Sequence, residues 1–265
     1  MKKILIQGLL IIVLFISTLL ILQQIDWMTI FKVQKLKTET EEKLGDLFWE
    51  TFQNEEDENT NQFVINTLDS IVTMICLENE IDKESIKIHI LNKDEINAFA
   101  LPDGHLVVYS GLILASDNQE ELSGVICHEI AHIELNHVMK KLMKELGLSV
   151  LISMTTGEGG AAIAKETAKL LSSSAFDRSL EKEADIKAVD YLIQAEIDPK
   201  PFADFLFRLS LDDNEIMKYL SWTSTHPDTQ ERAEYIIEYS QPSTSNYKRP
   251  ISSETWELLK IQFAE

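Results

Sequence analysis

Cysteine and basic residues are both scarce in this chain of 265 residues. There are two cysteines, Cys76 and Cys127, which are too few for a disulfide scaffold, and whether they pair is left open. We expect Cys127 to be a buried, apolar thiol. Lysine and arginine number 24 against 44 acidic residues, and the net charge is −20. This balance argues against nucleic acid or anionic lipid headgroups as the main partner, and its simplest consequence is solubility.

Long hydrophobic runs are also scarce, and the main one lies at the N-terminus. Residues 4–22 are 19 positions without a charge, enough for about 28 Å of helix, which is close to the thickness of a bilayer's hydrocarbon core. The run ends without a small-x-small cleavage site, so an uncleaved membrane anchor is favoured over a signal peptide. Lys2 and Lys3 favour a cytoplasmic N-terminus and an exported domain, although lysines follow the run as well.

Internal repeats and low-complexity tracts are absent from the sequence. Residues 149–164 are moderately apolar, but glycines and Glu158 make them too broken for a second span. They form either a flap over a cleft or an interhelical loop.

The clearest chemical pattern is His128-Glu129-x-x-His132. Histidines four residues apart lie on one helix face, so both imidazoles can reach one tetrahedral zinc ion. Glu129 would then lie where a carboxylate can take a proton from a metal-bound water. Asp117 followed by Glu120 indicates a capping box that starts this helix. Buried, neutral core histidines are the alternative, and a third ligand should decide between the two.

Alternating residues predict a small sheet just before this helix. Strands are expected at 86–90 and 105–110, with a turn at 102–104, and helices at 38–52, 63–77 and 178–192. A strand beside the histidine-bearing helix can hold an extended peptide by main-chain pairing, and an ordinary core hairpin is the alternative. The candidate substrate contacts are Asn97, Ala98, Phe99, Val107 and Tyr109.

Two acids on a later predicted helix are candidates for completing the metal site. Glu181 and Asp185 are four residues apart, so they lie on one face. Glu181 can serve as the third zinc ligand, and Asp185 can orient a ligand histidine through its free ring nitrogen. A solvated helix face is the alternative for an isolated pair of acids.

Four separated motifs are similar to one family. They are Asn97-Ala98-Phe99-Ala100-Leu101-Pro102 with the strand that follows, His128-Glu129-Ile130-Ala131-His132, Asp177-Arg178 before Glu181-x-x-Ala184-Asp185, and Thr225-His226-Pro227 with Arg232. In this order, over about residues 60 to 240, they resemble the exported and membrane-associated zinc metallopeptidases related to HtpX and the CAAX prenyl protease.

The resemblance implies a gluzincin (zincin-like) fold, α+β but mainly α, with a small β-sheet flanking the active-site helix. It implies one Zn²⁺ per chain held by His128, His132 and Glu181, with Glu129 as the general base and Asp185 behind the ligands. His226 falls in the family's His-Pro loop, where it would stabilise the oxyanion or cap the zinc in a latent form.

His137 is not expected to bind the metal. A metzincin places its third histidine six residues after the second, past a glycine, whereas here the gap is five without a glycine. We expect the helix to continue towards Leu146 and stop at Gly147. On such a helix, His137 points about 140° away from His132.

These expectations describe a zinc metalloendopeptidase that acts on envelope or misfolded proteins, anchored through residues 4–22 with its catalytic domain in the periplasm or otherwise outside the cytoplasm. The relatives are expected to have several spans or helical-repeat tails, and neither is found here, which disfavours prenylated peptides as substrates. The alternatives are a membrane-anchored, chaperone-like binding module with a latent zinc site, and a zinc hydrolase of non-peptide substrates.

The predicted divisions are an anchor at 1–25, a juxtamembrane helical segment at 26–60, the peptidase domain at 61–240, and a linker with a short helix at 241–265.

Overall fold

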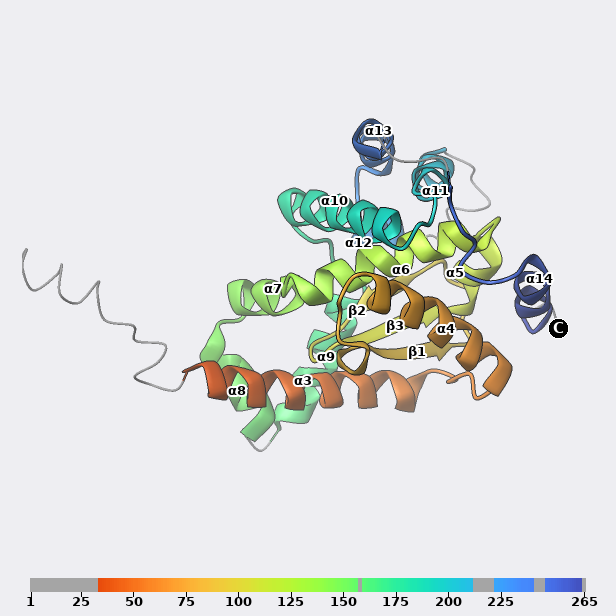
Figure 1. Cartoon of the computed structure of the whole chain (residues 1–265). Coiled ribbons are helices and arrows are strands. Elements are labelled where there is room, and N and C mark those ends of the chain that lie inside the picture. The colour runs from red at the N-terminus through yellow and green to blue at the C-terminus, as the bar shows by residue number, and fades with distance from the viewer. Residues whose placement is uncertain (1–32, 157–158, 212–221, 241–245, 264–265) are drawn as a thin grey trace, which may run out of the picture. The chain divides into compact units, whose positions relative to one another are not determined.

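The computed structural model describes residues 33–156, 159–211, 222–240 and 246–263 (Figure 1). The predicted anchor at residues 4–22 lies outside these ranges. Within them, no helix combines the length and the apolar character that a bilayer span requires. The chain divides into two compact units, Met1–Thr40 and Glu41–Glu265, and the second contains the sheet, the core and the site.

The described chain is mainly helical with one small sheet, as predicted. Its strands are β1 (Lys87–Leu91), β2 (Ala98–Ala100) and β3 (His105–Tyr109). The helices are α3 (Val33–Glu55), α4 (Gln62–Glu78), the 3-10 helix η1 (Lys83–Ser85), α5 (Ser110–Ala115), α6 (Gln119–Glu134), α7 (His137–Glu145), α8 (Leu148–Thr156), α9 (Gly160–Leu171), α10 (Arg178–Gln194), α11 (Lys200–Ser210), α12 (Trp222–Thr225), α13 (Thr229–Ser240) and α14 (Ser253–Ile261).

The sheet has the order β1-β3-β2, with β1 parallel and β2 antiparallel to β3. Central strand β3 pairs along both edges, since Val107 lies opposite His89 on one side and Phe99 on the other. The prediction that a substrate pairs along residues 105–110, which include Val107 and Tyr109, is therefore wrong. Only β1 and β2 have an outer edge, and that of β1 is partly covered by the isolated bridge of Glu58 with Leu91. The strand order that decides this is not encoded in any single strand's alternation.

Helix α6 forms the centre of the main core. It packs against α10 and α11 on one side and against β2 and α4 on the other (Figure 1). At Gly124 a Cβ would lie 2.4 Å from the side chain of Phe202, so only glycine permits this approach of α6 and α11. Cys76 and Cys127 are both free and buried in this core, which confirms the expectation for Cys127.

A second apolar cluster covers the other face of the sheet. It joins α3 to Phe99 and Tyr109 of the sheet and to the helical hairpin α8–α9. Residues 149–164 thus contribute mainly helix rather than an irregular loop, and their buried side chains, such as Leu151 and Ala164, pack in this cluster.

Both ends of α6 differ from the prediction. Its N-cap is Asn118, whose Oδ1 accepts from the Glu121 amide at 2.9 Å, while the Glu121 carboxylate accepts from the Asp117 amide at 2.8 Å. The capping box is therefore one residue later than predicted. At the other end the helix stops at Glu134, and Asn136 adopts a left-handed conformation (φ 56°, ψ 32°) before α7 starts. Asparagine tolerates this conformation, so the predicted continuation to Leu146 is wrong.

Candidate metal centre

Helix α6 presents His128 and His132 on one buried face. Their Nε2 atoms lie 3.0 Å apart, and both side chains are fully buried. The i, i+4 spacing therefore does what the sequence predicts, because it directs two imidazole nitrogens to the same point.

Two further donors reach this point from distant segments. Glu181 enters from the first turn of α10, with its Oε1 3.4 Å from Nε2 of His132. His226 enters from the connection between α12 and α13, with its Nδ1 3.2 Å from Nε2 of His128 and 3.0 Å from both oxygens of Glu181. One donor atom from each of these four residues lies within 4.8 Å of the other three.

Asp185 and Arg232 hold the ring of His128. The Asp185 Oδ1 lies 2.8 Å from Nδ1 of His128, the nitrogen that points away from the donor cluster. Arg232 donates to both oxygens of Asp185 at 2.7 and 2.8 Å, and its NH1 lies 3.1 Å from Oε2 of Glu181. Tyr235 also donates to Asp185. Asp185 thus has the orienting geometry predicted from its spacing to Glu181.

Ion pairing keeps both of these buried carboxyls anionic. Burial alone would raise the pKa of Asp185, but Arg232 and His128 bring it below its ordinary value. Burial likewise opposes ionisation of Glu181, and His226 together with Arg232 holds its pKa well below the usual range. A single guanidinium therefore stabilises one carboxylate of the donor cluster and the one behind it.

His132 is held from behind in a different way. Its Nδ1 lies 3.0 Å from Nδ1 of His137, whose Nε2 lies 3.3 Å from Oε2 of Glu183. His137 is not among the four clustered donors. It nevertheless turns towards His132, because the chain bends at Asn136 instead of continuing as a helix. The available sequence signal was the asparagine directly before His137, because asparagine readily adopts the left-handed conformation that ends a helix.

Glu129 has no hydrogen-bond partner for either carboxylate oxygen among the described residues, although it is fully buried. Its nearest charge is His226, whose Nε2 lies 3.3 Å from Oε1. Burial raises the pKa of Glu129, but His226 and the α6 histidines outweigh this and lower it. An anionic carboxylate beside a donor cluster can accept a proton.

Aromatic rings enclose the histidines. Trp222 lies against His226 with ring centroids 4.6 Å apart, and Phe176 stacks on His132 at 4.2 Å. Burial alone would lower the pKa of His226, but the carboxylates of Glu181 and Glu129 raise it to about 9. Nothing in the sequence distinguishes Trp222 and Phe176 from core residues, and Arg232 was part of the motif with Thr225-His226-Pro227 without an assigned role.

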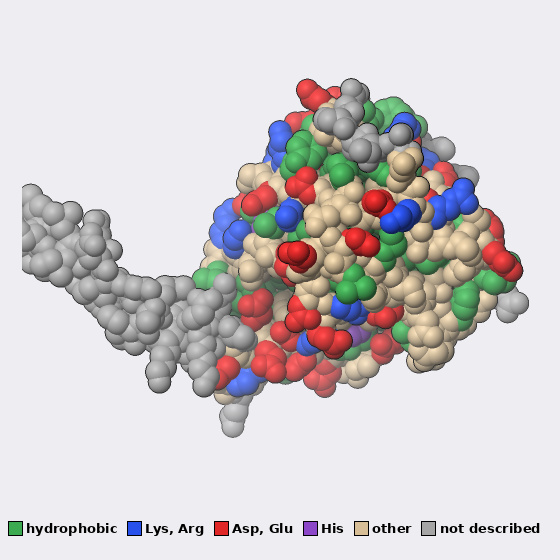
Figure 2. All heavy atoms as spheres, in the orientation of Figure 1, with side chains coloured by type: hydrophobic (Ala, Val, Ile, Leu, Met, Phe, Trp, Pro, Cys, Tyr) green, Lys and Arg blue, Asp and Glu red, His purple; other side chains and the backbone are tan. Residues whose placement is uncertain are grey.

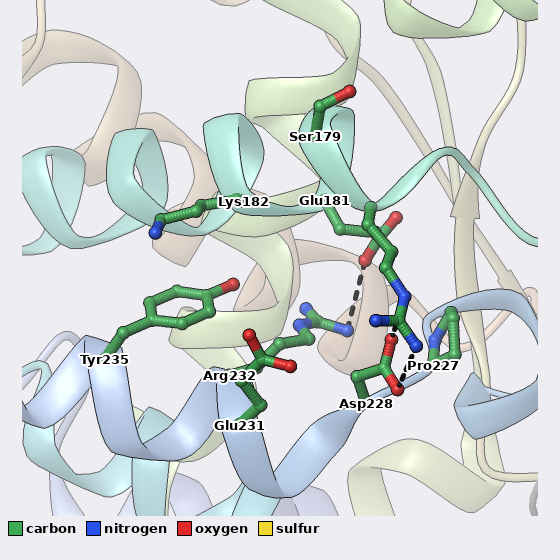
Figure 3. Close-up of a pocket in the computed structure, with 9 residues that line it drawn as sticks. Ser179, Glu181, Lys182, Pro227, Asp228, Glu231, Arg232 and Tyr235 are labelled. Atoms are coloured by element: carbon green, nitrogen blue, oxygen red, sulfur yellow. Dashed lines mark hydrogen bonds and ion pairs between the residues drawn. The ribbon is translucent and has the colours of Figure 1, made fainter.

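A pocket of about 260 Å³ adjoins Glu181 between α10 and α13 (Figure 3). Tyr235, Arg232 and Glu181 line it, and the ion pair of Arg178 with Asp228, at 2.8 Å, closes one side. This pair joins the start of α10 to the loop that carries His226.

The candidate substrate residues Asn97, Ala98 and Phe99 lie at edge strand β2 and are all buried. Asn97 donates through Nδ2 to the carbonyl of Ser172 at 3.3 Å, while its Oδ1 has no partner within the described chain.

The donor set fits a divalent metal ion. Two imidazole nitrogens and a carboxylate on one point, with a further imidazole beside them, match the ligand types of zinc sites in proteins. The anionic state of Glu181 and the partners behind both α6 histidines favour metal binding in the same way.

Comparisons with known proteins agree with this geometry. The chain is 31% identical over 168 residues to Metalloprotease LoiP of Escherichia coli (strain K12), which covers 60% of this chain and 65% of that protein. It is 27% identical over 181 residues to the Beta-barrel assembly-enhancing protease of Yersinia pestis, covering 60% and 37% of the two chains. It is also 30% identical over 165 residues to Metalloendopeptidase OMA1, mitochondrial, of Bos taurus, covering 56% and 31%.

The matched regions thus span from about a third to about two thirds of these relatives' own lengths. The model of Peptidase family M48 matches residues 65–240, a range that includes all four clustered donors and Glu129. Two of the named relatives are metalloproteases and the third is a protease, and the chain itself belongs to peptidase family M48.

Proposed function

We propose that the chain is a zinc-dependent metalloendopeptidase that hydrolyses peptide bonds of envelope or misfolded proteins. The observation that carries the proposal is the fully buried carboxylate of Glu129 beside the four clustered donors, with His226 as its charged neighbour at 3.3 Å. Burial of an ionised carboxylate costs free energy, so the place of Glu129 beside a donor cluster is best explained by chemistry. The proposal includes the closer relationship to HtpX and the CAAX prenyl protease that the four sequence motifs indicate.

His128, His132 and Glu181 would hold the zinc ion. When bound, zinc lowers the pKa of a water molecule and polarises the scissile carbonyl. Glu129 accepts the proton of the attacking water and returns it to the leaving amine. Asp185, fixed by Arg232, keeps the proton of His128 on Nδ1 and leaves Nε2 free as a ligand atom.

His226 caps this site in the proposed latent form. Its Nδ1 lies among the ligand atoms, and its Nε2 faces Glu129. One ring would therefore block both the approach of a water molecule to a bound metal ion and the carboxylate of Glu129. Stabilisation of the oxyanion, the other role considered for His226, requires the ring to leave this position.

Substrate binding is assigned to the edge strand β2. Its outer edge is the place on this sheet nearest to α6 where an extended peptide can add by main-chain pairing, and the buried Asn97 precedes it. The membrane anchor at residues 4–22 and a location outside the cytoplasm complete the proposal.

The second candidate function is a membrane-anchored, chaperone-like binding module. The capping by His226 is the observation that favours it, since a site closed in this way can hold metal without turning over. Glu129 argues for the peptidase, because binding alone needs no carboxylate at this position.

The test uses the full chain purified in detergent, with bound zinc and casein cleavage measured for the wild type and for Glu129→Gln. We expect one zinc per chain in both, and cleavage only in the wild type. Glu134→Gln, an exposed change on the same helix, is the matched control and should keep both properties. Cleavage retained in Glu129→Gln would remove the base assignment. Zinc without cleavage in every form would favour the binding module.

A companion variant tests the third ligand. Glu181→Ala should lose the metal, because it removes the one carboxylate among the four clustered donors, while circular dichroism should still show a helical fold. Wild-type zinc content in Glu181→Ala would show that the ligand set is wrong.

A further inference from the structure

We infer that His137 and Glu183 are positioning residues for the metal ligand His132, joined to it in a chain of hydrogen bonds that fixes its tautomer. The inference rests on the proposed function, since it assumes that Nε2 of His132 faces a bound metal ion. It adds two residues to the machinery that neither the histidine motif nor the acid pair on α10 includes.

The two ring nitrogens of His132 face different surroundings. Nε2 lies among the donors, 3.0 Å from Nε2 of His128 and 3.4 Å from Glu181. Nδ1 lies 3.0 Å from Nδ1 of His137, and the two rings cross at 70° with centroids 5.0 Å apart. His137 therefore contacts the one nitrogen of His132 that a metal ion leaves free.

This contact allows a single assignment of protons. A neutral imidazole that binds metal through Nε2 carries its proton on Nδ1, so His132 must donate and Nδ1 of His137 must accept. A neutral His137 that accepts at Nδ1 carries its own proton on Nε2. That nitrogen lies 3.3 Å from the Glu183 carboxylate, which can only accept. Every donor in the chain then meets an acceptor.

Its environment also identifies His137 as more than a core residue. The side chain is fully buried, and the contacts of its two nitrogens are His132 and Glu183. The chain uses a left-handed residue, Asn136, to bring His137 to this place, and the first turn of α7 then fixes it. A continuous helix would have pointed it away from His132.

The two α6 histidines are supported unequally. Asp185, behind His128, has no exposed surface and is itself held by Arg232, whereas the Glu183 side chain is 53% exposed and reaches His132 only through His137. Loss of Glu183 should therefore weaken metal binding less than loss of His137.

The first test compares two replacements of His137 by zinc affinity, measured in competition with a chelator on the full chain. Asparagine can place an acceptor oxygen where Nδ1 lies, whereas leucine fills a similar volume without one. We expect His137→Leu to weaken zinc binding about 10- to 100-fold and His137→Asn to stay within about threefold of the wild type. Equal losses in both variants would mean that the residue only packs, and unchanged affinity in His137→Leu would overturn the inference outright.

A second readout does not require a drastic core change. Glu183→Gln alters an exposed side chain that should not affect folding, and we expect it to lower zinc affinity about two- to fivefold, whereas Lys182→Gln beside it should not. Histidine ¹⁵N NMR of the zinc-loaded wild type should show His137 protonated on Nε2. A proton on Nδ1 of His137 would contradict the chain of bonds even if zinc binds normally. Failure of the wild type itself to bind zinc would instead remove the proposed function.

Discussion

At the scale of single residues, the centre contains three buried acids whose surroundings fit them for different roles. Glu181 and Asp185 are ion-paired with Arg232, whereas Glu129 is equally buried and lacks a hydrogen-bond partner in the described chain. Pairing makes a carboxylate a stable ligand or support, and the absence of a partner leaves it available for proton transfer. Among the described residues, His226 is the side chain that forms an ion pair with Glu129.

Removal of that restraint should raise activity. In His226→Ala, three ligand residues and Glu129 remain, so we expect wild-type zinc content and severalfold faster casein cleavage, because neither the open position nor the base is occupied. Turnover measured at saturating substrate checks this. The double variant with Glu129→Gln is the control and should be inactive. Normal zinc content with unchanged turnover would remove the capping role of His226.

At the scale of elements, a pair of histidines joins the sheet to α3. His89 of β1 and His105 of β3 lie 2.9 Å apart through their ring nitrogens, and Trp49 of α3 stacks on His89 with ring centroids 3.7 Å apart. Lys87 lies beside His105, and burial lowers the pKa of His89 to about 3 and that of His105 to about 4. Both rings are therefore neutral in the folded protein at neutral pH.

This pair should make the fold sensitive to acid. The unfolded chain binds protons at these histidines near pH 6.5, and the folded chain binds them only near pH 3 to 4. The free energy of unfolding therefore falls as the pH drops from about 6.5 towards 4. At pH 5 each histidine should cost on the order of 1–2 kcal/mol. Urea unfolding at pH 7.5 and pH 5 checks this. His89→Gln should show a smaller loss between the two pH values, and an equal loss would show that the pair does not titrate in this way.

Elements with a local signature were predicted well, and those that depend on distant contacts were not. Helices α4 and α6 and strands β1 and β3 follow from periodicity, and the spacing of His128 to His132 survives because it is set within one helix. The strand order depends on which edges meet, and the bend at Asn136 depends on one residue's backbone conformation.

The same distinction separates the parts of the site. Glu181 and Asp185 had a spacing signal, and the resemblance to a family supplied their roles. Arg232 organises both from a position 47 residues after Asp185, so its place in the fourth motif did not reveal its ion pairs with the two acids.

At the scale of the whole molecule, the site joins three separate parts of the chain. Its donors come from helix α6, helix α10 and the loop before α13. Acidic side chains are spread over the visible surface and gather along the edge formed by α3 (Figure 2). Part of the negative charge is thus located away from the buried centre.

A metal ion that ties three segments together should stabilise the fold. A ligand present at about 100 times its dissociation constant contributes about 2.7 kcal/mol. For a unit of this size, removal of zinc with EDTA should lower the melting temperature by about 5–10 °C. Differential scanning fluorimetry with and without EDTA checks this, and re-addition of zinc should restore the transition. In Glu181→Ala, EDTA should have no effect, and an equal shift there would place the stabilising ion elsewhere.

The spread of the donors along the chain has a consequence for biogenesis. His128 and His226 are 98 positions apart, and Glu181 lies between them. During synthesis the histidines of α6 leave the ribosome long before either of the other donors, so an incomplete chain carries the signature motif without a complete centre. The last of the four donors to leave the ribosome is His226, the residue that we propose covers Glu129.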